Sequence, residues 1–208
     1  MSSERGQAVG RGAAVAVSDP PPLSRAQRQA ALGHRGATVW FTGLPASGKT
    51  TLSAAVERAL VDRGHLAYRL DGDEVRRALC GDLGFDRAGR AENVRRVAHV
   101  ARILADASVL VLVALVSPYA VDRARARELH ETLGLPFVEV FVDTPIEVCE
   151  QRDPKGMYAR ARRGELTGFT GVGDPYEPPA NPDLRLAVQP PERSVRAVLR
   201  TLGRAGAI

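Results

Sequence analysis

The sequence predicts an α/β protein in which helices cover both faces of a mostly parallel β-sheet. Short apolar stretches alternate along the chain with segments whose apolar residues recur at helical spacing, which is the pattern of βα units. Residues 109–116 are all apolar and do not alternate, which is typical of a strand that helices cover on both faces. In such a fold we expect a binding crevice at the carboxyl ends of the strands.

Each expected strand is a short apolar run that stops at Gly, Asp or Ser-Pro, and each expected helix carries apolar residues three or four positions apart. In chain order the strands are Thr38–Phe41, Leu66–Leu70, Val109–Val116, Phe137–Val142 and Leu184–Val188. The helices are Lys49–Arg63, Glu74–Leu79, Ala91–Ala105, a segment from Pro118 to about Leu133, Pro145–Arg152 and Pro191–Leu202. Residues 153–183 are rich in Gly and Pro, so we expect a long mobile loop there, with one helical turn at Tyr158–Arg163.

The first 30 residues differ in composition from the rest of the chain. They are rich in Ser, Gly, Ala, Arg and Pro and show no sustained apolar period, so we expect a flexible extension before one domain over residues 31–208. No long apolar segment follows Met1, and we therefore expect no secretory signal and a cytoplasmic protein.

Composition excludes several classes of protein. The chain has 208 residues, 44% hydrophobic and 25% charged, which is ordinary for a globular core. Cys80 and Cys149 are its two cysteines, which excludes a disulfide scaffold and a multi-cysteine zinc site. The four histidines lack the spacing of metal ligands, and no apolar run is long enough to span a membrane.

The basic residues are almost all arginine. Of the 29 Lys and Arg residues, Lys49 and Lys155 are the two lysines, so both positions favour a compact ammonium group that guanidinium cannot replace. The net charge is +5, but the arginines are dispersed and form no stripe with aromatic residues, so we expect no nucleic-acid partner. A small anionic substrate accounts for the positive excess equally well.

A phosphate-binding motif follows the first strand and opens the first helix. The pattern G-x-x-x-x-G-K-[ST] is matched by Gly43, Leu44, Pro45, Ala46, Ser47, Gly48, Lys49 and Thr50. The loop N–H groups surround an oxyanion, Lys49 reaches the β- and γ-phosphates, and the hydroxyl of Thr50 is expected to bind Mg²⁺. Thr51 adds a hydroxyl near the α-phosphate. Neither lysine lies in the N-K-x-D motif that reads guanine, so we expect ATP and favour a small-molecule kinase.

Two carboxylates flank a glycine at the end of the second strand. Asp71 and Asp73 can point into the same crevice, where one carboxylate supports hydrated Mg²⁺ and the other accepts the proton of an acceptor hydroxyl. The alternative is a solvated Asp-Gly turn.

Further motifs make the chain similar to the adenylylsulfate kinase family from about Thr38 to Leu186. They are Asp71–Arg76, Asp82–Phe85, Arg90–Arg96, Ser117–Tyr119, Phe141–Pro145, Arg152–Gly156, Gly168–Gly171 and Asp174–Pro179. The resemblance implies a three-layer P-loop NTPase fold, like nucleotide kinases, with a mobile lid over about residues 153–171. It also implies transfer of the γ-phosphoryl group of ATP to the 3′-hydroxyl of adenosine 5′-phosphosulfate, and a homodimer.

The resemblance assigns roles to residues that composition alone does not single out. It implies that Phe85 and Phe169 stack on the adenine of the acceptor and that Arg76 and Arg90 bind its phosphosulfate. The remaining implied site residues are Asn93, Val116 and Ser117 at the acceptor, Lys155 at the transferring phosphoryl group and Arg152 near the adenine of ATP.

Three positions depart from the family pattern. Members usually have Asn at the position of Glu74, Gly near Ala78, and often Arg or Lys at the position of Ala120. Loss of a cation at position 120 puts the acceptor's affinity and identity in question. Two alternatives therefore stay open, a P-loop kinase for another small acceptor and a nucleotide-binding subunit without turnover.

Overall fold

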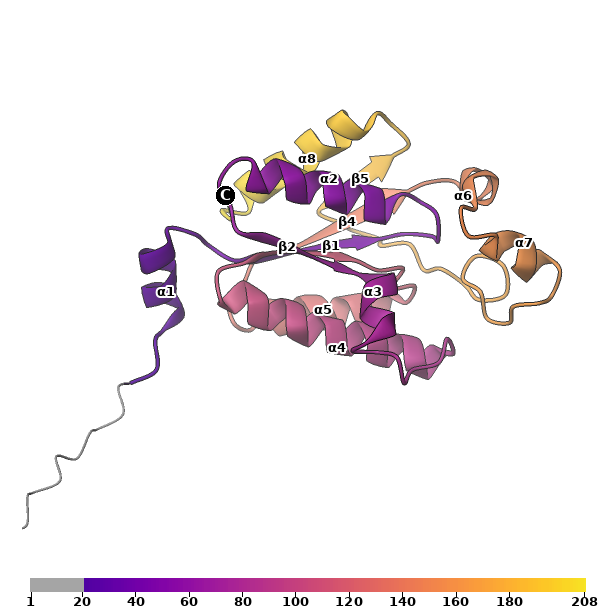
Figure 1. Ribbon diagram of the computed structural model, residues 1–208, viewed down its shortest axis with the longest axis horizontal. Helices are drawn as coiled ribbons and strands as arrows, with labels where there is room; N and C mark the ends of the chain where they lie inside the picture. Colours follow the sequence, from indigo (N-terminus) through magenta and orange to yellow (C-terminus); the bar gives the residue numbers. More distant parts are fainter. Residues whose placement is uncertain (1–20) are drawn as a thin grey trace, which may run out of the picture.

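The computed structural model describes residues 21–208 and contains one five-stranded parallel sheet between two layers of helices (Figure 1). The strands are β1 (Ala37–Thr42), β2 (Ala67–Asp71), β3 (Leu110–Ala114), β4 (Phe137–Asp143) and β5 (Leu184–Ala187). Their order in the sheet is β2-β3-β1-β4-β5, and every neighbouring pair is parallel. The predicted α/β class with a mostly parallel sheet is therefore confirmed.

The helices are close to the predicted ones, with ends that differ by a few residues. They are α1 (Arg25–Leu32), α2 (Lys49–Val61), α3 (Gly72–Arg77), α4 (Arg87–Asp106), α5 (Ala120–Glu131), α6 (Ile146–Arg152), α7 (Met157–Arg162) and α8 (Pro191–Arg204). Helix α4 begins four residues before the predicted start because the Asp86 side chain accepts the N–H of Gly89 at 2.8 Å and caps the helix.

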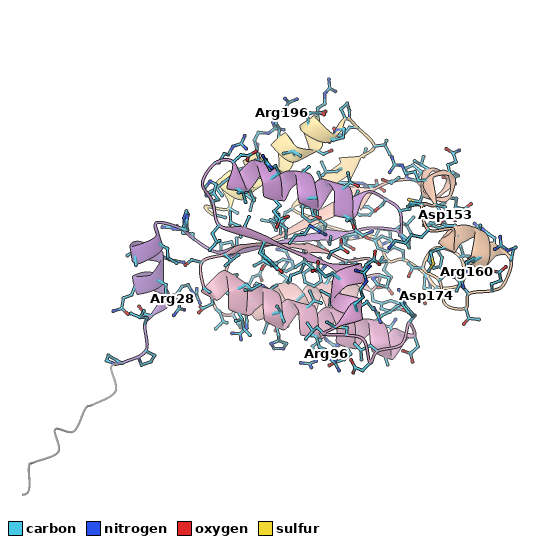
Figure 2. All side chains as sticks on the ribbon, in the orientation of Figure 1. Arg28, Arg96, Asp153, Arg160, Asp174 and Arg196 are labelled. Carbon is cyan, nitrogen blue, oxygen red and sulfur yellow. The ribbon has the colours of Figure 1, made fainter. Side chains whose placement is uncertain are left out.

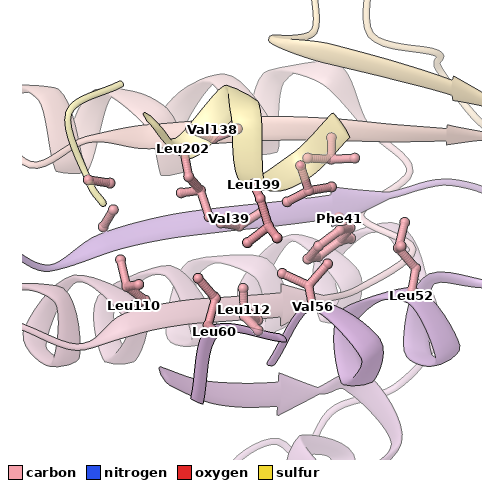
Figure 3. Packing of buried hydrophobic residues seen from close by; sticks show 14 of the residues in the cluster. Val39, Phe41, Leu52, Val56, Leu60, Leu110, Leu112, Val138, Leu199 and Leu202 are labelled. Carbon is pink, nitrogen blue, oxygen red and sulfur yellow. The ribbon is translucent and has the colours of Figure 1, made fainter. Parts of the chain in front are cut away.

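Two apolar cores hold the layers together. Helices α2 and α8 cover one face of the sheet and α4 and α5 cover the other (Figure 1). On the first face, Val56 and Leu60 of α2 and Leu202 of α8 are completely buried against strand residues such as Val39 (Figure 3). Because each fully buried aliphatic side chain contributes roughly 1.5–3 kcal/mol, these faces decide which way the helices lie on the sheet.

Helix α1 corrects the expectation that all of residues 1–30 form a flexible extension; residues 1–20 lie outside the described part. Ser24 and Gln27 form a capping box at its start, and Gly33 ends it in the left-handed region at φ 67°. No residue of α1 is buried, but Arg25 donates to Asp106 at the end of α4 at 2.8 Å, and Arg28 also pairs with Asp106. The partners in these two ion pairs are separated by 81 and 78 residues along the chain, so no local pattern in the sequence predicts them.

The segment over residues 153–171, for which the resemblance implies a lid, and α1 lie at opposite ends of the molecule (Figure 1). Arg28 marks the end with α1, whereas Asp153, Arg160 and Asp174 mark the end toward which the strands point their carboxyl termini (Figure 2). Within residues 21–208, no helix combines the length and apolar character needed to cross a lipid bilayer.

Candidate active site

A cavity of about 900 Å³ lies at the carboxyl ends of the strands and joins the predicted phosphate and acceptor regions. The predicted site residues that line it are Pro45, Ala46, Ser47, Gly48, Lys49, Thr50, Thr51, Asp71, Asp73, Arg76, Phe85, Arg90, Asn93, Val116, Ser117, Arg152, Lys155 and Phe169. Gly43 and Leu44 are the predicted residues that do not line it; Leu44 faces a neighbouring hollow instead.

The phosphate loop has the backbone shape that its sequence predicts. Gly43 and Gly48 have φ of 151° and 106°, in the region that favours glycine. A methyl group on Gly43 would also lie only 2.6 Å from the carbonyl oxygen of Val142. Thr144 and Tyr158 hold the loop from behind, because their hydroxyls donate to the carbonyls of Ser47 at 2.9 Å and Pro45 at 3.1 Å.

Lys49 is buried beneath this loop. Its ammonium group donates to the carbonyls of Gly43 at 2.9 Å and Leu44 at 2.6 Å, and to the Ser47 hydroxyl at 3.2 Å. Burial lowers the pKa of Lys49 to about 8, an effect that the nearby carboxylates of Asp71 and Asp73 oppose. Because all hydrogen-bond partners of the buried Lys49 ammonium group are neutral oxygens, its charge has no anionic partner in a direct bond and is suited to bind a phosphate.

Asp71 joins the phosphate loop to β2. Its Oδ2 accepts the Thr50 hydroxyl at 2.9 Å and an Arg69 N–H at 2.8 Å, while Oδ1 caps α3 by accepting the N–H of Asp73 at 3.0 Å. The neighbouring hydroxyl and carboxylate oxygens are ligands of the kind that Mg²⁺ prefers. Residues 21–208 contain no group of three or more His, Cys, Asp or Glu side chains that could hold a metal ion.

Asp73 and Lys155 meet at the mouth of the cavity. The lysine comes from the segment between α6 and α7, and its ammonium group forms an ion pair with the Asp73 carboxylate. Both side chains are 60% exposed, so the pair itself contributes little to stability. The structure thus brings together two predicted catalytic groups that are 82 residues apart in the sequence.

The acceptor region pairs aromatic rings with guanidinium groups. The guanidinium carbon of Arg76 lies 4.4 Å from the centre of the Phe85 ring, and Phe85 is 61% exposed. Arg90 donates to the carbonyls of Phe85 and Gly168, both at 2.7 Å, and so connects the two loops that carry the aromatic residues. Phe169 packs edge-on against Tyr158 at 5.0 Å. Burial and the charge of Arg90 lower the pKa of Arg76, so two guanidinium groups lie close together in this region.

Two polar side chains in the cavity wall have no hydrogen-bond partner within residues 21–208. Asn93 of α4 and Thr170 after Phe169 are 6% and 1% exposed, yet Nδ2 of Asn93 and Oγ1 of Thr170 are unpaired. Buried polar groups are normally satisfied, so both atoms favour a polar ligand. Thr170 was not predicted as a site residue, although it lies within the Gly168–Gly171 motif.

Ser117 lies in the cavity wall but its hydroxyl points into a hydrogen-bond network. It accepts the indole N–H of Trp40 at 3.0 Å and donates to Thr42 at 3.1 Å, and the side chain is 3% exposed. The residue itself has a φ of 39°, in the left-handed region that is costly for a non-glycine residue.

Sequence reasoning missed a second group of cavity residues at the end of β5 and the start of α8. They are Leu186, Ala187, Val188, Gln189, Pro191 and Ser194. None carries unusual chemistry, and they line the cavity because β5 pairs with β4 in the same parallel sheet and ends at the same edge as the other strands.

Comparison with known proteins decides among the P-loop kinases. The family model for adenylylsulphate kinase matches residues 35–187, most of the chain. The chain belongs to the adenylylsulphate kinase family. The adenylyl-sulfate kinases of Saccharomyces cerevisiae and Penicillium chrysogenum are 49% and 52% identical to it over 166 and 171 residues. These matches cover 80% and 79% of this chain and 82% and 81% of the two relatives. The family predicted from the motifs is therefore confirmed.

A further relative is a larger protein that this chain matches over only part of its length. The bifunctional enzyme CysN/CysC of Mycobacterium tuberculosis is 56% identical over 161 residues, which are 77% of this chain but 26% of that enzyme. The solved structure of the M. tuberculosis APS kinase CysC in complex with AMPPNP and APS has a TM-score of 0.80 and 53% identity. The match covers 82% of this chain and 99% of that one.

Proposed function

We propose that this kinase transfers the γ-phosphoryl group of ATP to the 3′-hydroxyl of adenosine 5′-phosphosulfate, giving 3′-phosphoadenylyl sulfate and ADP. The observation that carries the proposal is the lining of one continuous cavity by both a phosphate loop and the Phe85, Arg76 and Arg90 group. The relative of 53% identity that was solved with AMPPNP and APS supports the same pair of substrates.

The phosphate loop would hold the donor. Its backbone N–H groups and the start of α2 favour the phosphates of ATP, and Lys49 would leave its carbonyl partners to bond β- and γ-phosphate oxygens. Thr50 would contribute a ligand to Mg²⁺, with Asp71 beside it; the ion, when bound, neutralises charge on the transferring group. Arg152, which donates to the Ser47 carbonyl at 3.3 Å, would border the adenine of ATP.

The aromatic and guanidinium groups would hold the acceptor. Arg76 covers one face of Phe85, so the adenine would stack between the other face and Phe169. Arg76 and Arg90 would bind the phosphosulfate, and the unpaired amide of Asn93 would donate to the substrate. Val116 and Ser117 would form the adjacent wall.

Transfer would proceed by direct in-line attack. The 3′-oxygen of the acceptor forms a bond to the γ-phosphorus while the bond from that phosphorus to the β,γ-bridging oxygen breaks. Asp73 would accept the hydroxyl proton, and Lys155 would bring its charge to the transferring group as the lid closes. The hydroxyl of Ser117 is bonded to Trp40 and Thr42, which favours a structural contribution over a covalent intermediate.

The test is coupled ADP release with Mg·ATP, comparing adenosine 5′-phosphosulfate, AMP and no acceptor. We expect rapid turnover only with the phosphosulfate. ATP binding without that turnover would contradict the acceptor assignment and lead to Ala120→Arg as the next variant. The same sample in sedimentation equilibrium tests the homodimer, which the family resemblance supports.

A further inference from the structure

We propose that Arg123, a buried arginine on α5 outside the cavity, is a positioning residue. It fixes the turn at Ser117 and the end of the lid in place relative to each other. The proposal rests on the proposed function, because these two segments border the acceptor region. We call residues 174–177, which lead from the lid back to the sheet, the lid root.

Arg123 bonds three separate parts of the chain at once. Its side chain is 3% exposed, and its Nε donates to Glu139 of β4 at 2.8 Å. Its two terminal nitrogens donate to the carbonyls of Ser117 and of Glu177, each at 2.7 Å. The planar guanidinium group makes all three bonds because its three nitrogens donate in fixed, different directions. A lysine has a single nitrogen, which cannot occupy all three positions.

Neighbouring bonds connect the same two segments. The N–H of Glu177 donates to the Pro118 carbonyl at 2.8 Å, and its carboxylate accepts the N–H of Ala120 at 2.7 Å. The Tyr119 hydroxyl donates to the Asp174 carboxylate at 2.9 Å. The lid root is therefore bonded to the segment that follows β3, and Arg123 is the one cation that joins both to the sheet within residues 21–208.

The turn at Ser117 needs such support. Its left-handed φ of 39° costs free energy for serine, and such conformations persist where the surroundings over-determine them. Here Trp40 and Thr42 hold the Ser117 side chain while Arg123 holds its carbonyl. The cavity is lined here by Val116, Ser117 and Pro118. A change in the backbone conformation of this turn would therefore displace the cavity wall next to the acceptor.

The test compares Arg123→Lys with Arg127→Lys. Arg127 lies one helical turn further along α5 and pairs with Asp183 at 2.5 Å and with the same Glu139 at 3.9 Å. Its bonds within residues 21–208 reach neither the Ser117 turn nor the lid root. We expect Arg123→Lys to raise the KM for adenosine 5′-phosphosulfate about tenfold and leave the KM for ATP within about twofold. We expect Arg127→Lys to change neither.

Hydrogen exchange provides a readout that does not depend on turnover. In Arg123→Lys the amides of the non-proline residues in 116–120 and 174–177 should exchange several-fold faster, while those of β1 and β4 stay at wild-type rates. If the wild-type protein fails to use the phosphosulfate, the proposed function fails, and exchange still decides the role of Arg123. Wild-type exchange and KM values in Arg123→Lys, or the same changes in Arg127→Lys, would overturn the proposal.

A double variant separates positioning from stability. Arg123→Ala would leave the buried Glu139 carboxylate with only the longer contact to Arg127 at 3.9 Å, and it can unfold the protein. Arg123→Met combined with Glu139→Leu removes both charges at similar volume, which buried pairs often tolerate. We expect this variant to fold and to show the same rise in acceptor KM and the same fast exchange, because its bonds to Ser117 and Glu177 are gone. A folded double variant with wild-type values would refute the role.

Discussion

The Thr50 hydroxyl donates a hydrogen bond to Oδ2 of Asp71 at 2.9 Å, joining the end of the phosphate loop to the end of β2. The two residues are 21 positions apart, and a parallel sheet brings them together because both follow the carboxyl end of a strand. This contact places a carboxylate beside the expected metal ligand.

We predict that Asp71→Asn raises the Mg²⁺ concentration needed for half-maximal activity about tenfold and lowers kcat, because the charge beside Thr50 is lost. Initial rates over a Mg²⁺ titration measure this. Asp143→Asn is the matched control, since Asp143 ends β4 and pairs with Arg185 at 2.7 Å outside the cavity. Equal Mg²⁺ dependence in the two variants would argue against a role for Asp71 at the metal.

Lys49→Ala should reduce phosphoryl transfer at least about a thousandfold, because no other ammonium lies under the phosphate loop in residues 21–208. The fold should persist, since Lys49 bonds only its own loop. Circular dichroism and ADP release measure both effects. Lys155→Ala should reduce the rate far less, because Lys155 lies in an exposed segment between α6 and α7. Full activity in Lys49→Ala would refute the phosphate-site assignment.

Phe85→Ala should raise the acceptor KM about tenfold or more, because stacking a base on an aromatic ring contributes about 1–3 kcal/mol. The KM for ATP should change less than twofold. Tyr68→Ala is the control, since Tyr68 is 53% exposed on β2 and does not line the cavity. An equal rise in both KM values for Phe85→Ala would contradict the stacking assignment.

His130 should make stability depend on pH. It is fully buried, with its ring nitrogens 2.9 Å from the Thr38 hydroxyl and 2.7 Å from the Ala126 carbonyl, and burial lowers its pKa below the ordinary value. Below about pH 6.5 the unfolded chain then binds a proton that the folded protein does not. The free energy of unfolding should fall with decreasing pH, by up to about 1.4 kcal/mol per pH unit from this residue.

Urea unfolding of wild type and His130→Gln between pH 7 and 5 measures this contribution. We expect a shallower slope of the unfolding free energy against pH in the variant, because Gln cannot take up a proton at position 130. Identical slopes in wild type and His130→Gln would mean that His130 protonates equally in both states.

Asp106→Ala should loosen α1 without loss of transfer, because the Asp106 carboxylate pairs with both Arg25 and Arg28. Helix α1 lies at the end of the molecule opposite α7 (Figure 1). Surface pairs contribute about 0.2–1 kcal/mol each, so the free energy of unfolding should fall by no more than about 2 kcal/mol. Faster hydrogen exchange that is confined to α1 would confirm that the Asp106 side chain holds this helix. A large loss of activity would show that α1 acts on the site; Asp62→Ala, which breaks a comparable pair with Arg58, is the control.

The sequence by itself determined the fold class, the family and the phosphate loop, and all but two of the site residues predicted from it line the cavity. Apolar periodicity decides which face of a helix or strand is buried, and it is a local property of the chain. The loop from Gly43 to Thr50 is equally local, since its glycines, lysine and hydroxyl act within one turn. Because these features depend on residues that are close together in the chain, a single sequence is enough to predict them.

Only the tertiary structure decided the pairings between distant residues. Asp73 meets Lys155, Asp106 anchors α1, and Arg123 joins Ser117, Glu139 and Glu177. Nothing in the sequence distinguishes Arg123 from the other arginines, because charge and donors are the same in each. Its role comes from burial and direction, which depend on where packing places three backbone segments around one guanidinium group.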